Sequence, residues 1–290
     1  MYHPSPRDRR TSLILILCGL SAIARPAAQF VSGVSLVEVY VSVTDPHGEP
    51  VSGLSRTDFT VEEDGQPQRV DTFAAGEFPL SVAIAIDRSF SVTAARLNAT
   101  TAAAARFVSE LRPDDQVMVM AIGSTVEVLA PLSTDRGASR AALSTIERWG
   151  TTPLYDAAAA AIDGVEPARG RRALIVLSDG SDRYSALSGA DLVQKARRSD
   201  VLIYPIALGK ERPPIFAELA AVTGGRSFQA SDERSLSSTL GAIARELRAQ
   251  YLLGYAPARE AATAPRWRSI QVRVSRPDVR VRARDGYLSR

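Results

Sequence analysis

Three oxygen-bearing residues stand at alternate positions directly after the apolar run Ser81–Ile86: Asp87, Ser89 and Ser91. If their side chains converge, one carboxylate and two hydroxyls form a cation site without sulfur or imidazole. Such a donor set suits a hard ion, Mg²⁺ first and Mn²⁺ next. The pattern alone is not specific, because Asp and Ser are also the residues preferred as caps of a following helix.

Two later segments strengthen the metal interpretation. Thr152 lies in Gly150–Ala157, and Asp179 ends the apolar run in Ala173–Gly180. These segments, like the first, fall where a strand ends or a helix begins, which is where open α/β sheets bind their ligands. Two carboxylates brought together without a cation would repel and raise each other's pKa. This repulsion is a physical reason to expect a bound dication.

Two of the ligand assignments have rivals close by in the chain. Thr151 competes with Thr152, which could also be no more than a helix cap before Pro153. Asp182 competes with Asp179, which could be an ordinary turn residue. We favour Asp179 because it ends its strand as Asp87 does.

The elements that must position these residues follow a strand-helix-strand pattern. Helical spacing of apolar residues predicts helices over 97–111 and 236–247, and an alanine-rich helix over Leu154–Ile162 with Pro153 at its first position. Val126–Leu129 is predicted to be an antiparallel edge strand, and Pro205 indicates a bulge or an edge. The fold class is therefore α/β, a doubly wound and mostly parallel sheet. Buried parallel strands are expected at 81–86, 117–122, 173–178 and 201–207.

The flanks on both sides of this region alternate in the manner of half-buried strands. We expect the N-terminal strands to pack with the C-terminal ones into one small β-unit. The predicted organisation is a signal peptide at 1–28, N-terminal strands at 29–78, the α/β domain at 79–250 and C-terminal strands at 251–290. The strands themselves are expected at 37–43, 59–62, 68–73, 251–255, 270–274 and 279–283.

Asp87, Ser89, Ser91, Thr152 and Asp179 resemble, in order and in context, the metal-ion-dependent adhesion site of the von Willebrand factor type A (VWA) domain. The resemblance spans about residues 79–250, and it favours Thr152 because that family places its ligand directly before a segment like PLYDA. It implies a site in which these residues surround one divalent cation, partly through water. An acidic side chain of a partner then completes the coordination shell.

The chain departs from the usual VWA pattern at Arg88 and Phe90, where small residues are common. We expect Phe90 to narrow access to the metal and to be available for ligand contact, and Arg88 to add positive charge beside it. Trp149 is expected to be a packing residue. The flanking sequences also resemble those of a bacterial VWA-related family described mainly from acidobacterial genomes.

The first thirty residues differ in composition from the rest. Arginines precede the apolar stretch Ser12–Ala24, which is too short to span a bilayer comfortably, and small residues follow it. This pattern predicts a signal peptide and an exported bacterial protein, either periplasmic or secreted. The single cysteine, Cys18, lies inside the stretch, so the mature chain would have no thiol chemistry and no disulfide.

The inventory of residues also limits the function. Beyond residue 28 the only histidine is His47, which argues against a Ser-His-Asp triad and a histidine-based zinc site. Basic and acidic residues are equal in number there, so no global charge favours nucleic acid. We therefore expect a Mg²⁺- or Mn²⁺-dependent binding or adhesion protein, not an enzyme, whose partner is a protein presenting an acidic residue.

Two alternatives remain open at this point. The first is an envelope structural protein that binds anionic polymers through an arginine-rich C-terminal sheet, although such arginines can equally be a solvated strand face that discourages aggregation. The second is a metal-assisted hydrolase, which lacks any general base besides the ligands themselves. The arginines concerned are Arg266, Arg268, Arg273, Arg276, Arg280, Arg282, Arg284 and Arg290.

Overall fold

The computed structural model describes residues 36–76, 78–209, 211–257 and 265–289. The predicted signal peptide and its Cys18 lie outside these ranges. Ser35–Arg290 form one compact unit. Within the described ranges, no helix has both the length and the apolarity needed to cross a membrane.

A six-stranded sheet forms the centre of the α/β region, in the order β10-β9-β8-β5-β6-β7. All neighbouring strands run parallel except β7, which pairs antiparallel with β6 at the edge. The four predicted parallel strands and the antiparallel edge strand are thereby confirmed. Pro205 lies in β9, whose outer side pairs only with the two-residue β10, so the edge interpretation holds along most of that strand. The strands are β5 (Leu80–Asp87), β6 (Gln116–Ile122), β7 (Val126–Ser133), β8 (Arg171–Ser178), β9 (Val201–Ala207) and β10 (Phe228–Gln229).

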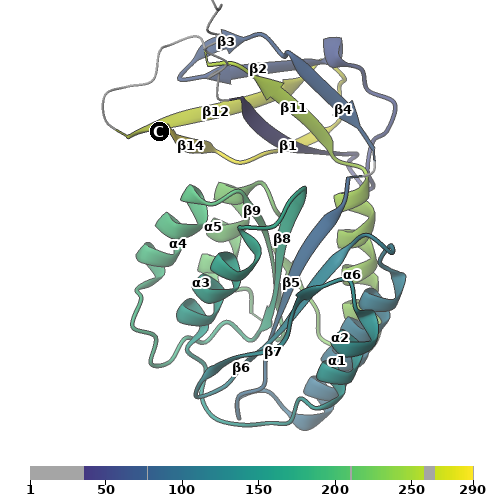
Figure 1. Cartoon of the computed structure of the whole chain (residues 1–290), viewed down its shortest axis with the longest axis vertical. Helices are drawn as coiled ribbons and strands as arrows, with labels where there is room; N and C mark the ends of the chain where they lie inside the picture. The colour runs from purple at the N-terminus through teal and green to yellow at the C-terminus, as the bar shows by residue number, and fades with distance from the viewer. Residues whose placement is uncertain (1–35, 77, 210, 258–264, 290) are drawn as a thin grey trace, which may run out of the picture. The chain divides into compact units, whose positions relative to one another are not determined.

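The central strand β5 is buried along its whole length because helices cover both faces of the sheet. Its side chains alternate: Ile84 and Ile86 face one apolar cluster, and Ala83 and Ala85 face the other. The first cluster receives α1, α2 and α6, and the second receives α3, α4 and α5 (Figure 1). The small alanines of β5 face the alanine-rich helix α3, which allows close packing against the strand.

The three predicted helices are present, and three more were not predicted. Pro153 is the residue before α3 and not its first residue, which corrects the expectation, because its ψ of 69° is not helical. Helix α1 is capped by Thr93, whose side chain accepts a hydrogen bond from the Arg96 amide. The helices are α1 (Ala94–Glu110), α2 (Arg136–Ser144), α3 (Leu154–Val165), α4 (Gly189–Arg198), α5 (Pro214–Thr223) and α6 (Glu233–Arg248).

The flanks form two four-stranded sheets that share one apolar core, and each sheet mixes strands from both ends of the chain. Their orders are β13-β1-β11-β4 and β14-β12-β2-β3, so the predicted joint β-unit is confirmed. The single strand predicted over 68–73 is wrong: the chain leaves β3 at Gln68 and enters β4 at Thr72, in the other sheet. The strands are β1 (Val37–Thr44), β2 (Phe59–Glu63), β3 (Gln66–Gln68), β4 (Thr72–Ala75), β11 (Tyr251–Tyr255), β12 (Arg266–Val274), β13 (Arg280–Arg282) and β14 (Gly286–Ser289).

Carboxylates near the N-terminal ends of the central strands are paired with arginines. Asp115, directly before β6, is 1% exposed and accepts hydrogen bonds from the Leu80 amide (3.0 Å), the Arg112 amide (2.8 Å) and the Arg248 guanidinium (3.1 Å). Glu246 of α6 is likewise buried, forms an ion pair with Arg282 and accepts from the Tyr204 hydroxyl. These buried charges are compensated within the protein.

Candidate metal centre

Asp87 ends β5 at the C-terminal edge of the sheet, and its carboxylate is fully buried. The Ser89 amide donates to its Oδ1 at 2.9 Å, and the Ser178 hydroxyl donates to its Oδ2 at 2.6 Å. The hydroxyls of Ser89 and Ser91 lie 2.9 Å apart. The first three predicted ligands are therefore brought together, because the chain turns back over the strand end.

Burial raises the pKa of the Asp87 carboxyl, an effect opposed by its hydrogen bonds from Ser178 and Ser89 and increased by the negative charge of Asp179. Asp179 follows β8, the neighbour of β5 in the sheet, so the two carboxylates are held at the same edge. Neither forms an ion pair with any residue in the described ranges. A buried carboxylate beside a second negative charge is unfavourable unless a cation compensates both.

The segment that contains Thr152 is tied to both of the other ligand segments through the backbone. The Phe90 amide donates to the Gly150 carbonyl at 3.1 Å, and the Arg183 amide donates to the Thr152 carbonyl at 2.7 Å. The Thr152 side chain is buried, and its hydroxyl makes no hydrogen bond within the described part of the chain. The protein therefore leaves this hydroxyl available as an oxygen ligand for a metal ion.

The geometry also bears on the rival ligands. Thr151 is partly exposed, and its amide donates to the Ser124 hydroxyl. Asp182 Oδ1 accepts from the Tyr155 amide (3.1 Å) and the Ser185 hydroxyl (2.6 Å), so this carboxylate is occupied at the start of α3.

Within the described ranges, Asp179 Oδ1, by comparison, accepts only from the Ser181 amide, at 2.9 Å. The capping role that Asp87, Ser89 and Ser91 could have had belongs to Thr93. The arrangement favours Asp179 and Thr152, and it gives the Asp-Ser-Ser set no capping function in α1.

Sequence reasoning missed Ser178. Its hydroxyl donates to Asp87 and accepts from the Gly180 amide at 3.0 Å, so it connects the two ligand-bearing strands and orients the buried carboxylate. The only signal was its position directly before Asp179. Recognising its role requires knowing that β5 and β8 are neighbours.

Arg88 and Phe90 differ from each other in what they contribute. Arg88 is 2.8 Å from Glu127 and lies over the Trp149 ring, 5.2 Å from its centroid, with a largely buried side chain. Its charge is thus compensated by Glu127 and adds little beside the metal ligands. Phe90, in contrast, is exposed. The expected extra charge does not arise, whereas the expected aromatic side chain is available at the surface.

The five residues fit a hard divalent cation. They supply two carboxylates and three hydroxyls, and these are the oxygen donors that Mg²⁺ and Mn²⁺ accept. The described residues contain no cluster of three or more His, Cys, Asp or Glu side chains, so a site for a softer metal is not indicated there. The other three ligands are neutral hydroxyls, so the protein's charge would only balance that of a dication, and a coordination position beyond these five would be open to an anionic ligand.

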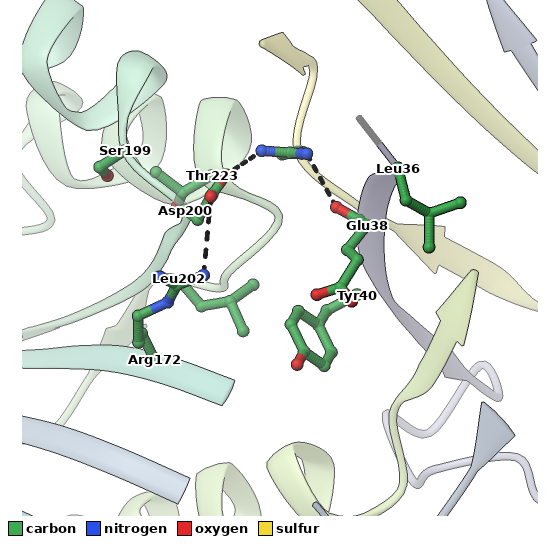
Figure 2. A pocket seen from close by; sticks show the side chains of 9 residues that line it. Leu36, Glu38, Tyr40, Arg172, Ser199, Asp200, Leu202 and Thr223 are labelled. Carbon is green, nitrogen blue, oxygen red and sulfur yellow. Dashed lines mark hydrogen bonds and ion pairs between the residues drawn. The ribbon is translucent and has the colours of Figure 1, made fainter. Parts of the chain in front are cut away.

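A pocket of about 160 Å³ lies at the opposite edge of the sheet, near the starts of β8 and β9 (Figure 2). Asp200 there forms ion pairs with Arg284 and, at 3.6 Å, with Arg172, and Arg284 also donates to the Glu38 carbonyl. The charges of Asp200, Arg172 and Arg284 are therefore compensated by one another. This pocket therefore offers a ligand fewer uncompensated polar groups than the proposed metal centre does.

Comparisons with known proteins agree with the geometry. Residues 82–181 match the model of the von Willebrand factor type A domain. A von Willebrand factor type A structure from Catenulispora acidiphila has a TM-score of 0.53 at 13% identity, covering 87% of this chain and 73% of that one. Proximal thread matrix protein 1 of the mussel byssus has a TM-score of 0.52 at 16% identity, covering 72% and 50%.

A third structure, the vWF domain of a type V pili tip protein from Porphyromonas gingivalis, has a TM-score of 0.50 at 12% identity, covering 58% of this chain and 95% of that one. At these identities the structural likeness establishes the fold alone. No curated protein sequence gives a significant match. The matched segment contains all five predicted ligands. The family match and the doubly wound sheet together identify this chain as one that contains a von Willebrand factor type A domain.

Proposed function

We propose that this protein binds a partner through a divalent cation, Mg²⁺ or Mn²⁺, held by Asp87, Ser89, Ser91, Thr152 and Asp179. The proposal rests on polar groups at the C-terminal edge of the sheet that the protein itself does not pair. A fully buried carboxylate lies near a second one with no ion pair in the described residues, and the Thr152 hydroxyl, on a segment tied to both ligand segments, has no hydrogen bond within the described residues. A cation at this position would satisfy all of these groups.

The chain's own residues would prepare the binding step. Ser178 and the Ser89 amide hold the Asp87 carboxylate in one orientation. Ser89, Ser91 and Thr152 offer neutral oxygens, so the protein supplies only two negative charges. When bound, the ion supplies a coordination position that a partner Asp or Glu carboxylate can complete. The low local dielectric at this buried edge strengthens that contact.

The proposed role is binding and not catalysis, in an exported bacterial protein. The described residues near the site include no histidine and no carboxylate beyond the ligands that is free to act as a general base, because Asp182 and Asp156 both accept hydrogen bonds that hold the start of α3 and its neighbouring loop. A shared fold with a pili tip protein is compatible with a binding role.

The arginine-rich sheet is a weaker candidate for the functional surface. Most of its arginines are already in ion pairs with carboxylates of the protein, which lowers their attraction for an external polyanion. The paired residues are Arg266 and Arg268 with Asp64, Arg273 with Glu62, Arg282 with Glu246 and Arg284 with Asp200.

Isothermal titration calorimetry with Mn²⁺ and Mg²⁺ tests the proposal directly. We expect single-site binding by the wild-type protein, loss of that binding in Asp179→Asn, and unchanged binding in Asp200→Asn, a matched acid at the opposite edge of the sheet. Equal metal binding by wild type and Asp179→Asn would contradict the assignment.

A further inference from the structure

Large apolar side chains are exposed around the proposed metal centre. Phe90 is 64% exposed, Trp149 42% and Tyr184 83%. Phe90 lies within the first segment that supplies proposed metal ligands, Trp149 directly precedes the second, and Tyr184 follows the third. Among the described residues, only Leu36 and Val128 are other large hydrophobic side chains with comparable exposure. Exposed aromatics gathered at one edge of a domain indicate an interaction surface.

The segments that carry these rings are held to one another by the backbone. The Trp149 amide donates to the Arg88 carbonyl at 2.8 Å, and the Phe90 amide donates to the Gly150 carbonyl. These hydrogen bonds hold the loop segments that carry Phe90 and Trp149 next to each other. Trp149 also packs over the backbone of Gly123, where an added Cβ would lie 2.7 Å from its ring. The rings are thus presented on a fixed frame beside the ligands.

Tyr184 is held in an unusual conformation. Its φ is +70°, in the left-handed region that residues other than glycine rarely adopt. The adjacent Arg183 amide is bonded to the Thr152 carbonyl, which fixes the loop in this form. A strained backbone that presents an almost fully exposed tyrosine is consistent with use of that ring in binding.

The same edge carries guanidinium groups that the protein does not neutralise. Arg148 donates to the Phe90 carbonyl at 2.7 Å and lies over the Phe90 ring at 5.7 Å from its centroid. Neither Arg148 nor Arg183 has a carboxylate partner within the described part of the chain. With the metal-ligand charges balanced by a dication, these two arginines leave the rim positive and complementary to an acidic partner.

We infer that the partner is an acidic peptide segment in which an aromatic or large aliphatic side chain lies within two residues of the carboxylate that meets the cation. Phe90, Trp149 and Tyr184 contact that apolar side chain, and Arg148 and Arg183 favour further acidic residues around it. The inference rests on the proposed function, because the cation fixes where the carboxylate is placed.

Selection from displayed peptides tests this inference. Two libraries of random heptapeptides, one with a central Asp and one with a central Asn, are selected on the full protein in Mg²⁺ and in chelator. The test variant is Phe90→Ala with Tyr184→Asn, since Asn tolerates the left-handed backbone. Trp149 is left in place because it packs on Gly123. Val128→Ala removes an exposed hydrophobic side chain elsewhere and serves as the matched control.

The expected result has three parts. Wild type enriches Asp over Asn peptides about tenfold in Mg²⁺ only, with Phe, Tyr, Trp or Leu overrepresented next to the Asp. The double variant lowers this enrichment about three- to tenfold, as loss of aromatic contacts predicts. The control variant leaves it unchanged, and calorimetry gives the same Mn²⁺ affinity for all three proteins.

Other outcomes overturn one statement or both. Mg²⁺-dependent Asp selection without a preference at the flanking positions would overturn the inference and leave the proposed function standing. Absence of Mg²⁺-dependent Asp selection would overturn both. Chelator-insensitive binding to phosphatidylserine vesicles that the double variant abolishes would show that the rings serve a membrane surface, and would also overturn the inference.

Discussion

Two buried aspartates stand at opposite edges of the same sheet and differ in what surrounds them. Asp115, before β6, has an arginine at 3.1 Å and two backbone amides. Asp87, at the end of β5, has one amide and one hydroxyl and lies near another carboxylate. Both are almost wholly inaccessible to solvent. The protein compensates the charge of Asp115 with an arginine, and it provides no positive charge for Asp87 within the described residues.

This difference separates a structural charge from a functional one. Burial alone does not distinguish them, because the two side chains have the same exposure. The presence or absence of a compensating cation distinguishes them. A negative charge that is buried without a partner lowers the stability of the folded protein. At Asp87 that loss coincides with the hydroxyls of the proposed metal site, which is the reason we propose a function for this edge and not for the other.

The largest effect is expected at Asp115, the buried carboxylate whose charge the protein compensates. Asp115→Ala removes the partner of Arg248 and the acceptor of two amides, and we expect it to lower the free energy of unfolding by about 3–5 kcal/mol. Equilibrium urea denaturation measures this change. A loss below about 1 kcal/mol would break the comparison, because Asp115 would then not be the structural charge it is taken to be.

The next effect is stabilisation by metal. At a free Mg²⁺ concentration one hundred times its Kd, the wild-type protein should gain about 2.7 kcal/mol in unfolding free energy, because only the folded state holds the site. Asp87→Asn should gain nothing under the same conditions. Thermal or urea denaturation with and without Mg²⁺ gives the result, and equal gains in both proteins would exclude Asp87 as a ligand.

A third test compares the two aspartates without metal. In chelator, the free energy of unfolding of Asp87→Asn should lie within about 1 kcal/mol of the wild-type value. The side-chain amide removes an uncompensated buried charge, and its oxygen still accepts the hydrogen bond from the Ser89 backbone amide. The same denaturation series as for Asp115→Ala measures it. A loss as large as that of Asp115→Ala would mean that Asp87 is structural as well.

The smallest effect concerns a paired carboxylate in the flanking sheets. The hydrogen bond from Arg268 lowers the pKa of Asp64, so this group contributes stability above its unfolded pKa and loses it as the pH falls through its folded value. Asp64→Asn should therefore cost about 0.5–1 kcal/mol at pH 7, and this cost should shrink as the pH falls through the folded-state pKa of the carboxyl. Unfolding free energies measured across this range check the sign; a difference that grows toward acid pH would reverse it.

Much of the α/β region could be predicted from sequence, because buried parallel strands are uninterrupted apolar runs and the ligand residues end them directly. Ile84 and Ile86 face one layer and Ala83 and Ala85 the other, a pattern that requires covering helices on both sides. Helices α2, α4 and α5 were missed. The first two begin at polar caps, Asp135 and Ser188, and have few apolar positions.

The flanks were harder because their strands change sheets. Residues 69–71 look like part of one strand, yet β3 pairs with β2 and β4 pairs with β11 in the other sheet. Local propensity cannot reveal which partner a strand takes. The same limit applies at the site, where Ser178 acts on a residue of the neighbouring strand, and where only the contacts show that Asp182 is occupied and Arg88 is compensated.

The interleaving of the two ends of the chain has a consequence for the order of folding. Strand β1 pairs with β11 and β13, and β2 pairs with β12, so the partners of these strands are made only after the whole α/β region. The flanking sheets cannot close before β11 to β14 have been synthesised. The VWA domain between them has its own contiguous core and can condense earlier. Slow closure of the long-range pairs would then be the last kinetic phase, and until then the edges of β1 and β2 would remain open to mispairing.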